Sequence, residues 1–216
     1  MRVGARTLHR FGRGDNRGRT ASSVAGTRRT QYSERVHAIR TRLLAFLIDY
    51  LLILAYLAVL AGVGTFLTLG PFRDAWRDLL STPARMDFLA FLVTVLPVTL
   101  YFALSESSSR GASVGKRRMG LRVVGMDGGR VPLGRALVRS ALKFLPWQLA
   151  HTGMLNIPGF PIEPTDPPAW TTAMLVAVWV LVVAYLFGLT PLGGSRPLYD
   201  RVAGTRVVAL DQGQAS

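Results

Sequence analysis

The sequence predicts an all-α membrane protein, a four-helix transmembrane bundle with a small cytoplasmic β-ribbon. Three observations predict this fold. Apolar runs at about 43–66, 86–104 and 171–189 approach or exceed the ~20 residues that cross ~30 Å of hydrocarbon. Arginine and lysine accumulate in alternate connecting loops, and a short β-type motif occurs twice. A soluble domain would not usually carry three such runs.

The basic residues predict which loops face the cytoplasm, because arginine and lysine accumulate on that side. The segment before the first run is rich in arginine, and the stretch 105–139 carries seven arginines and one lysine. The stretch 152–170 has neither, and in the connection 61–85 aspartates offset the arginines. This alternation requires four crossings, with both termini in the cytoplasm.

The fourth crossing must lie at about 134–157, where the chain is more polar. This stretch contains Arg135, Arg139, Lys143 and Pro146. A helix that turns its polar groups toward its neighbours can still cross the bilayer. The alternative is an amphipathic helix lying in the interface.

The remaining segments have simpler expectations. Residues 1–35 form an Arg/Gly-rich cytoplasmic tail with few residues to bury, and we expect this tail to be disordered. Residues 212–216 are a flexible tail, which leaves 36–211 as the membrane domain. Within the outer connection, 71–80 has an apolar face that predicts a short interfacial helix with Trp76 at headgroup level.

The repeated motif predicts the β-ribbon. GLRVVGMD at 120–127 recurs as GTRVVALD at 204–211, with five of eight positions identical. We expect strands at about 120–126, 130–133 and 204–210, the first two joined by a turn at Asp127-Gly. The same register aligns Lys116 with Asp200, and we hypothesise that these opposite charges pair.

Several functional classes are excluded by what the chain lacks. It has no cysteine, its three histidines are scattered, and no catalytic motif or paired carboxylates occur. The segment 111–117 resembles a phosphate-binding loop but lacks one spacer residue and the final Ser/Thr. We therefore expect no enzyme, metal, cofactor or nucleic-acid partner; a lipid-modifying enzyme is the remaining catalytic alternative.

An aspartate inside the first apolar run is the main candidate site. Charges within membrane segments are costly, and such residues are functional candidates by default. Arg42 and Asp49 are seven residues apart, so they share a helix face but lie about 10 Å apart along the axis. Arg139 and Lys143, one turn apart on the predicted third span, are the candidate cations for Asp49.

Three blocks resemble the RDD family of bacterial membrane proteins: RLLAFLID at 42–49, GASVGKRRMGLRVV at 111–124 and YDRVAGTRVV at 199–208. The resemblance implies that Arg42, Asp49 and Asp200 are the arginine and two aspartates of the family signature. Tyr199 stands where many members have a histidine. The resemblance also implies a bacterial plasma membrane, and the preference for arginine, with Lys116 and Lys143 the only lysines, is typical of GC-rich genomes.

Two functions follow from these expectations. The first is a transporter, or a transport component, for an ion or small solute, with Asp49 as the embedded charge; transport has been suggested for the family. Four short spans leave little room for a path, so we then expect a homo-oligomer. The alternative is a membrane adaptor or scaffold whose charged network, with Lys116, Arg139 and Lys143 as supporting residues, is structural. Either way the lipid bilayer is a partner.

Overall fold

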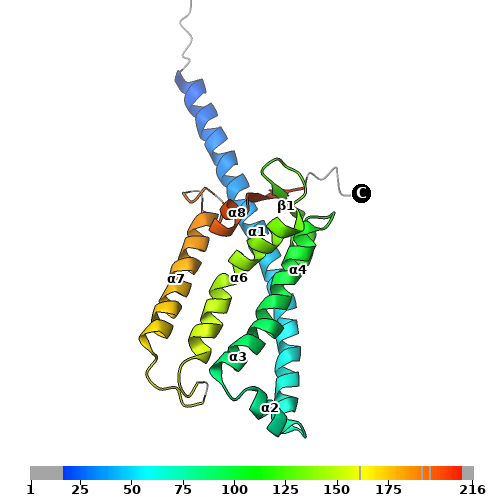
Figure 1. Cartoon of the computed structure of the whole chain (residues 1–216). Coiled ribbons are helices and arrows are strands. Elements are labelled where there is room, and N and C mark those ends of the chain that lie inside the picture. Colours follow the sequence, from blue (N-terminus) through cyan, green and yellow to red (C-terminus); the bar gives the residue numbers. More distant parts are fainter. Residues whose placement is uncertain (1–16, 161, 191, 195, 211–216) are drawn as a thin grey trace, which may run out of the picture. The chain divides into compact units, whose positions relative to one another are not determined.

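The computed structural model describes residues 17–160, 162–190, 192–194 and 196–210, with side chains described from residue 40 onward. The chain divides into two units, Met1–Arg40 and Thr41–Ser216, and the packing described below lies within the second. The elements are α1 (Arg17–Leu69), α2 (Arg73–Leu79), α3 (Pro83–Ala90), the π-helical segment η1 (Phe91–Val95), α4 (Leu96–Ser107), α5 (Val114–Arg118), β1 (Leu121–Gly125), α6 (Leu133–Leu155), α7 (Ala169–Leu189), α8 (Leu198–Val202) and β2 (Thr205–Ala209) (Figure 1).

Within the described part of the chain, three helical segments are long and apolar enough to cross a membrane: Arg40–Leu69, Pro83–Ser107 and Ala169–Leu189. They coincide with the three predicted apolar runs. Many of their large apolar side chains are exposed, Trp179 of α7 among them, as expected for surfaces that lipid covers. α6 is too polar to belong to this set, so the predicted count of four spans does not follow from composition.

α6 nevertheless lies between α4 and α7 and contacts both (Figure 1). Its buried face carries Ala136, Arg139, Ser140 and Phe144, which recur at helical spacing. Val138 is exposed on another face. The expectation that the polar groups of this helix face its neighbours is therefore confirmed for Arg139 and Ser140.

Tyrosines from neighbouring helices satisfy the two carbonyls that helix prolines leave free. Proline has no N–H, so the carbonyl four residues earlier loses its partner. The residue four positions before Pro97 is Val93, and the Tyr56 hydroxyl of α1 donates to the Val93 carbonyl at 2.6 Å. The residue four positions before Pro146 is Leu142, and the Tyr185 hydroxyl of α7 donates to the Leu142 carbonyl at 2.6 Å. Each bond ties one helix to the next where an unpaired carbonyl would be costly.

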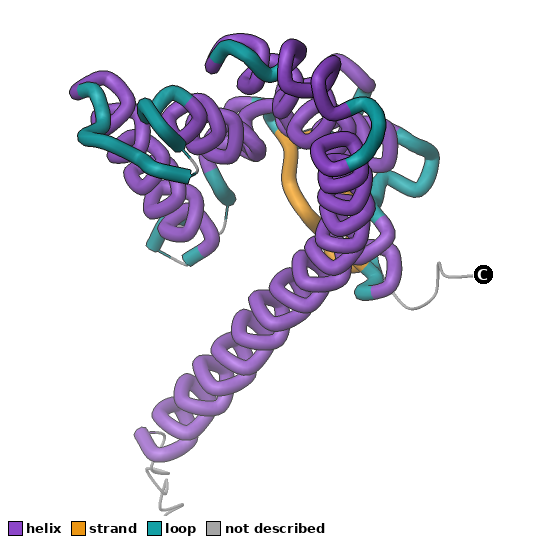
Figure 2. The backbone as a smooth tube through the Cα atoms, turned by 90° about the horizontal axis from the view of Figure 1, so that it is seen from below, coloured by secondary structure: helices purple, strands orange, loops and turns teal. Residues whose placement is uncertain are grey.

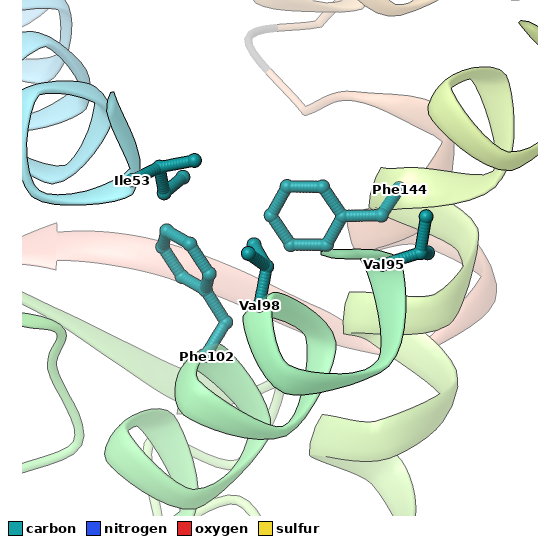
Figure 3. Close-up of a cluster of buried hydrophobic side chains, with 5 residues drawn as sticks. All are labelled: Ile53, Val95, Val98, Phe102 and Phe144. Atoms are coloured by element: carbon teal, nitrogen blue, oxygen red, sulfur yellow. The ribbon is translucent and has the colours of Figure 1, made fainter. Parts of the chain in front are cut away.

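An apolar cluster joins α1, α4 and α6 (Figure 3). It consists of Ile53, Val95, Val98, Phe102 and Phe144. The Phe102 and Phe144 ring centroids lie 5.2 Å apart in a tilted arrangement, a favourable aromatic geometry. Inside a bilayer this packing contributes through van der Waals contact, since lipid is as apolar as the cluster.

β1 and β2 pair as an antiparallel ribbon, which confirms the predicted pairing of the repeated strands (Figure 2, orange). Val123 pairs with Val207, its own counterpart in the repeat. Gly120 and Gly204 precede the two strands with φ of 63° and 61°, a left-handed conformation that glycine adopts without strain. A second apolar cluster of Ala103, Val123, Val131 and Ala136 packs under the ribbon.

One expectation about local structure is wrong. Residues 130–133 do not form a strand, because the turn after β1 closes locally, with Gly125 N–H donating to the Gly129 carbonyl at 2.9 Å, and Pro132 then precedes α6. Within the predicted tail, α1 begins at Arg17. Residues 1–16 and 211–216 lie outside the described residues. The predicted helix in 71–80 is confirmed as α2.

Candidate functional site

The Asp49 carboxylate fastens α5 to α1. Its Oδ2 accepts a hydrogen bond from Ser113 Oγ at 2.5 Å, and its Oδ1 accepts from Gly115 N–H at 2.8 Å and from Tyr101 O–H at 3.2 Å. The Tyr101 hydroxyl in turn accepts from Val114 N–H at 3.0 Å. Only 2% of Asp49 is exposed. Asp49 thus satisfies the Gly115 N–H and Tyr101 satisfies the Val114 N–H, two groups at the start of α5 that have no partner within the helix.

Glycine at position 115 makes this contact close. A Cβ placed there would meet the carbonyl oxygen of Ala45 and lie 2.9 Å from Asp49 Cγ. No other residue fits without moving α5 away from α1. We refer to Asp49, Tyr101, Ser113 and Gly115 as the Asp49 cluster.

Four charged side chains form a second group, the ion-pair chain. Lys116 of α5 contacts Glu106 Oε1, and Arg139 of α6 contacts Glu106 Oε2. Arg139 Nε also donates to Asp200 Oδ1 of α8 at 2.7 Å. Glu106, Arg139 and Asp200 are almost fully buried. Two cations and two carboxylates alternate, so the ion-pair chain is neutral, as a buried network must be to be tolerated.

Hydroxyl and aromatic groups complete the surroundings of Asp200 and Arg139. Thr205 Oγ1 of β2 donates to Asp200 Oδ1 at 2.7 Å. The Arg139 guanidinium lies 5.3 Å from the centre of the Tyr199 ring, a cation–π distance. Burial raises the pKa of Tyr199 to about 12, although the nearby Arg139 opposes the shift. Tyr199 therefore stays neutral here at physiological pH.

Lys143 lies beside both groups but contacts aromatic rings. Its Nζ is 3.5 Å from the centre of the Phe102 ring and 5.0 Å from that of Phe144. The negative faces of the rings attract the ammonium.

The three signature residues do not meet in one site. Arg42 donates to the Val207 carbonyl of β2 at 3.1 Å. Asp49 holds α5, and Asp200 binds Arg139. Each residue takes part in a contact between a long helix, α1 or α6, and one of the short elements after α4 or α7. The three signature residues therefore hold the short elements against the same end of the helix bundle.

Two predicted pairings are wrong. Lys116 binds Glu106 instead of Asp200, because Glu106 at the end of α4 and Arg139 on α6 lie between the two. Asp49 accepts from two hydroxyls and one backbone N–H group, and Arg139 contacts Glu106 and Asp200 instead of Asp49. Lys143 contacts aromatic rings and interacts with Asp49 electrostatically, without a direct ion pair among the described residues. The start of α5 supplies enough donors to solvate the carboxylate without a cation.

Sequence reasoning missed Glu106, Tyr101, Ser113 and Thr205. Hydropathy ends the second span at 104, but α4 continues to Ser107 and so buries Glu106 in the bundle. One signal pointed to it: Glu106 is an acid at the start of the strongly basic stretch 105–139. An isolated acid beside many cations is a candidate for a buried partner.

A smaller polar group joins α3 to the C-terminal part of α6; the two helices lie side by side there (Figure 1). Thr152 Oγ1 donates to Asp87 at 2.9 Å, and Gln148 Nε2 donates to Asp87 at 3.2 Å. Among the described residues, no three His, Asp or Glu side chains gather as a metal site.

The sequence model of the RDD family matches residues 36–204, which is most of the chain. The matched range contains Arg42, Asp49 and Asp200 as well as Glu106, Lys116 and Arg139. No curated protein and no solved structure matches the chain.

Proposed function

The chain belongs to the RDD family, and from the contacts of its signature residues we propose that it is a multi-pass membrane scaffold or adaptor whose charged network is structural. The observation that carries this proposal is that the carboxylates of the network have their partners within the protein. Asp49 accepts three hydrogen bonds, and each carboxylate of the ion-pair chain contacts a cation. A network satisfied in this way supports a fixed arrangement of helices and leaves few groups for a reaction.

The scaffold we propose crosses the plasma membrane four times, with α6 as the third span. The paired strands support this topology, because α6 and α7 are the helices between β1 and β2. A single crossing by α7 would place the strands on opposite sides, so α6 must cross as well. The basic residues around β1 and β2 support a cytoplasmic ribbon and cytoplasmic termini.

Transport of an ion or small solute is the second candidate. It is favoured by the nature of the Asp49 contacts, which are two hydroxyls and one backbone N–H. Hydroxyls can rotate away and leave the carboxylate to an incoming cation, whereas an arginine fork would hold it. A solute path would then require a homo-oligomer, since four helices enclose little space.

Replacing Asp49 with asparagine separates the two functions. The amide oxygen can still accept from Gly115 and Tyr101, but the amide nitrogen cannot accept from Ser113 and the remaining bonds lose their charge. The scaffold proposal therefore expects the free energy of unfolding to fall by about 1–3 kcal/mol. Asp74→Asn, an exposed aspartate of α2, is the matched control and should change little. Unfolding of purified protein in detergent measures both.

The same proteins in liposomes with an internal pH-sensitive dye supply the second readout. The scaffold proposal expects wild-type proteoliposomes to show the proton and alkali-cation fluxes of protein-free liposomes. A wild-type flux that exceeds this background, with the excess lost in folded Asp49→Asn and kept in Asp74→Asn, would contradict the scaffold proposal and support transport.

A further inference from the structure

The ribbon has a second face that the charged network does not use. Side chains alternate along a strand, and residues opposite each other in the pairing point to the same side. Val123 and Val207 belong to the apolar cluster under the ribbon. The other face therefore carries Arg122 and Val124 from β1 and Arg206 and Val208 from β2.

The two arginines on this face are equivalent in the repeat. Arg122 pairs with Val208, and Arg206 pairs with Val124, so the arginines are diagonal neighbours across the ribbon. Diagonal neighbours are about 7–8 Å apart at their backbone positions. Two long guanidinium side chains at that separation can reach one small anion placed between them.

Arg122 has an unmet hydrogen-bonding group. Its Nε is buried and has no hydrogen-bond partner among the described residues, while the Arg206 side chain is exposed. Ion pairs found among the described residues involve neither arginine. Asp127, the nearest acid along β1, accepts from the Gly129 N–H of its own turn. A buried N–H of a charged group normally has an acceptor. Because Arg122 is only part-buried, the rest of its guanidinium can be reached by an acceptor from outside the chain.

We propose that Arg122 and Arg206 bind a phosphate group, supplied by the headgroup of an anionic phospholipid. A guanidinium offers two parallel N–H groups that match the oxygens of phosphate. The ribbon joins the ends of membrane-embedded helices, because β1 follows α4 and β2 follows α7 after short connections. Lipid phosphates lie at that level of a membrane, and basic residues near helix ends attract them. The inference requires only that these helices cross a bilayer, not that the protein is a scaffold.

The test measures binding of short-chain lipids to the purified full chain in neutral detergent. Dihexanoyl-phosphatidylglycerol is the anionic probe, dihexanoyl-phosphatidylcholine carries the same phosphate without net charge, and inorganic phosphate tests a free anion. Native mass spectrometry counts the bound molecules, and a titration gives the dissociation constant. We expect the phosphatidylglycerol constant to be at least about tenfold lower than that of phosphatidylcholine, a difference of about 1.4 kcal/mol.

Variants assign the binding to the two arginines. Arg206→Gln alters an exposed side chain and should fold normally, yet weaken phosphatidylglycerol about tenfold. Arg122→Lys keeps the charge but loses the fork, so it should weaken binding as well. Arg135→Gln removes an equally exposed arginine from the start of α6, off the ribbon, and should leave the dissociation constant within about twofold.

The outcomes are distinct. Tight phosphatidylglycerol binding that falls in Arg206→Gln and Arg122→Lys, but not in Arg135→Gln, supports the proposal. Inorganic phosphate that binds as tightly and depends on the same arginines would keep the phosphate site and overturn the lipid as its source. Equal losses in Arg206→Gln and Arg135→Gln, with Arg122→Lys unchanged, would reduce the effect to net charge and overturn the site, as would the absence of binding.

Discussion

The two copies of the repeat, α5–β1 and α8–β2, share a backbone and differ in how they are fastened. Each short helix and each strand begins and ends at positions 84 residues apart, and a left-handed glycine lies between them in both copies. The first copy is held by an acid on α1, since Asp49 accepts from the start of α5. The second is held by a cation on α6, since Arg139 binds Asp200 within α8.

This difference explains why equivalent positions carry opposite charges. Lys116 in the first copy and Asp200 in the second each face a buried partner from the bundle. Those partners, Glu106 and Arg139, bind each other. The two copies are therefore joined through one neutral ion-pair chain. They share the same backbone fold but carry opposite charges at equivalent positions.

The largest expected effect comes from breaking the join itself. Arg139→Met leaves Glu106 and Asp200 buried with Lys116 as the one remaining cation of the ion-pair chain. Breaking a buried network in this way costs about 3–5 kcal/mol. Unfolding monitored by loss of helical circular dichroism should detect it.

Arg135→Met, one turn earlier on α6, is the matched control. Arg135 is exposed, so its replacement should change the free energy of unfolding by no more than about 0.5 kcal/mol. Equal stability of both variants and the wild type would mean that the ion-pair chain does not hold the copies together.

A smaller effect should appear when the first copy alone is disturbed. In Gly115→Ala the added methyl group meets the Ala45 carbonyl, so α5 must move from α1 and strain its bonds to Asp49. Overpacking of this kind costs about 1–3 kcal/mol. Gly64→Ala in α1, where nothing lies within 4 Å, should be neutral or gain up to about 1 kcal/mol from helix propensity. Similar values for the two variants would contradict the close contact.

The smallest effect concerns the second copy at alkaline pH. Burial raises the pKa of Tyr199 from its ordinary value of 10 to about 12, so the folded protein keeps a proton that the unfolded chain releases. The stabilisation is complete below pH 10 and is lost as pH rises from 10 to 12. Between pH 10 and 12, the free energy of unfolding should therefore fall less steeply with pH for Tyr199→Phe than for the wild type. The same pH dependence in both proteins would show that burial does not raise the pKa of Tyr199.

Sequence patterns predicted the features that depend on local order. Apolar runs located the helices of all three candidate spans, and the repeat at 120–127 and 204–211 predicted which strands pair. Both signals work because hydrophobic length and strand periodicity are read along the chain.

Features that depend on three-dimensional neighbours were not predictable in the same way. The partner of Lys116 is Glu106 because α4 runs three residues past the apolar segment, and no periodicity marks that extension. The donors to Asp49 come from a five-residue helix whose position is set by tertiary packing. The turn predicted at Asp127 forms, but no strand follows it, since α6 begins at Leu133.

A double-mutant cycle on Lys116 and Asp200 tests the central claim most directly. Lys116→Met leaves the ion-pair chain with an excess negative charge, and Asp200→Asn leaves it with an excess positive charge. Together they leave the neutral pair Glu106–Arg139, so the double variant should lose at least about 1 kcal/mol less than the sum of the single losses. Losses in the free energy of unfolding that add to within about 0.5 kcal/mol would contradict a single chain joining the two copies.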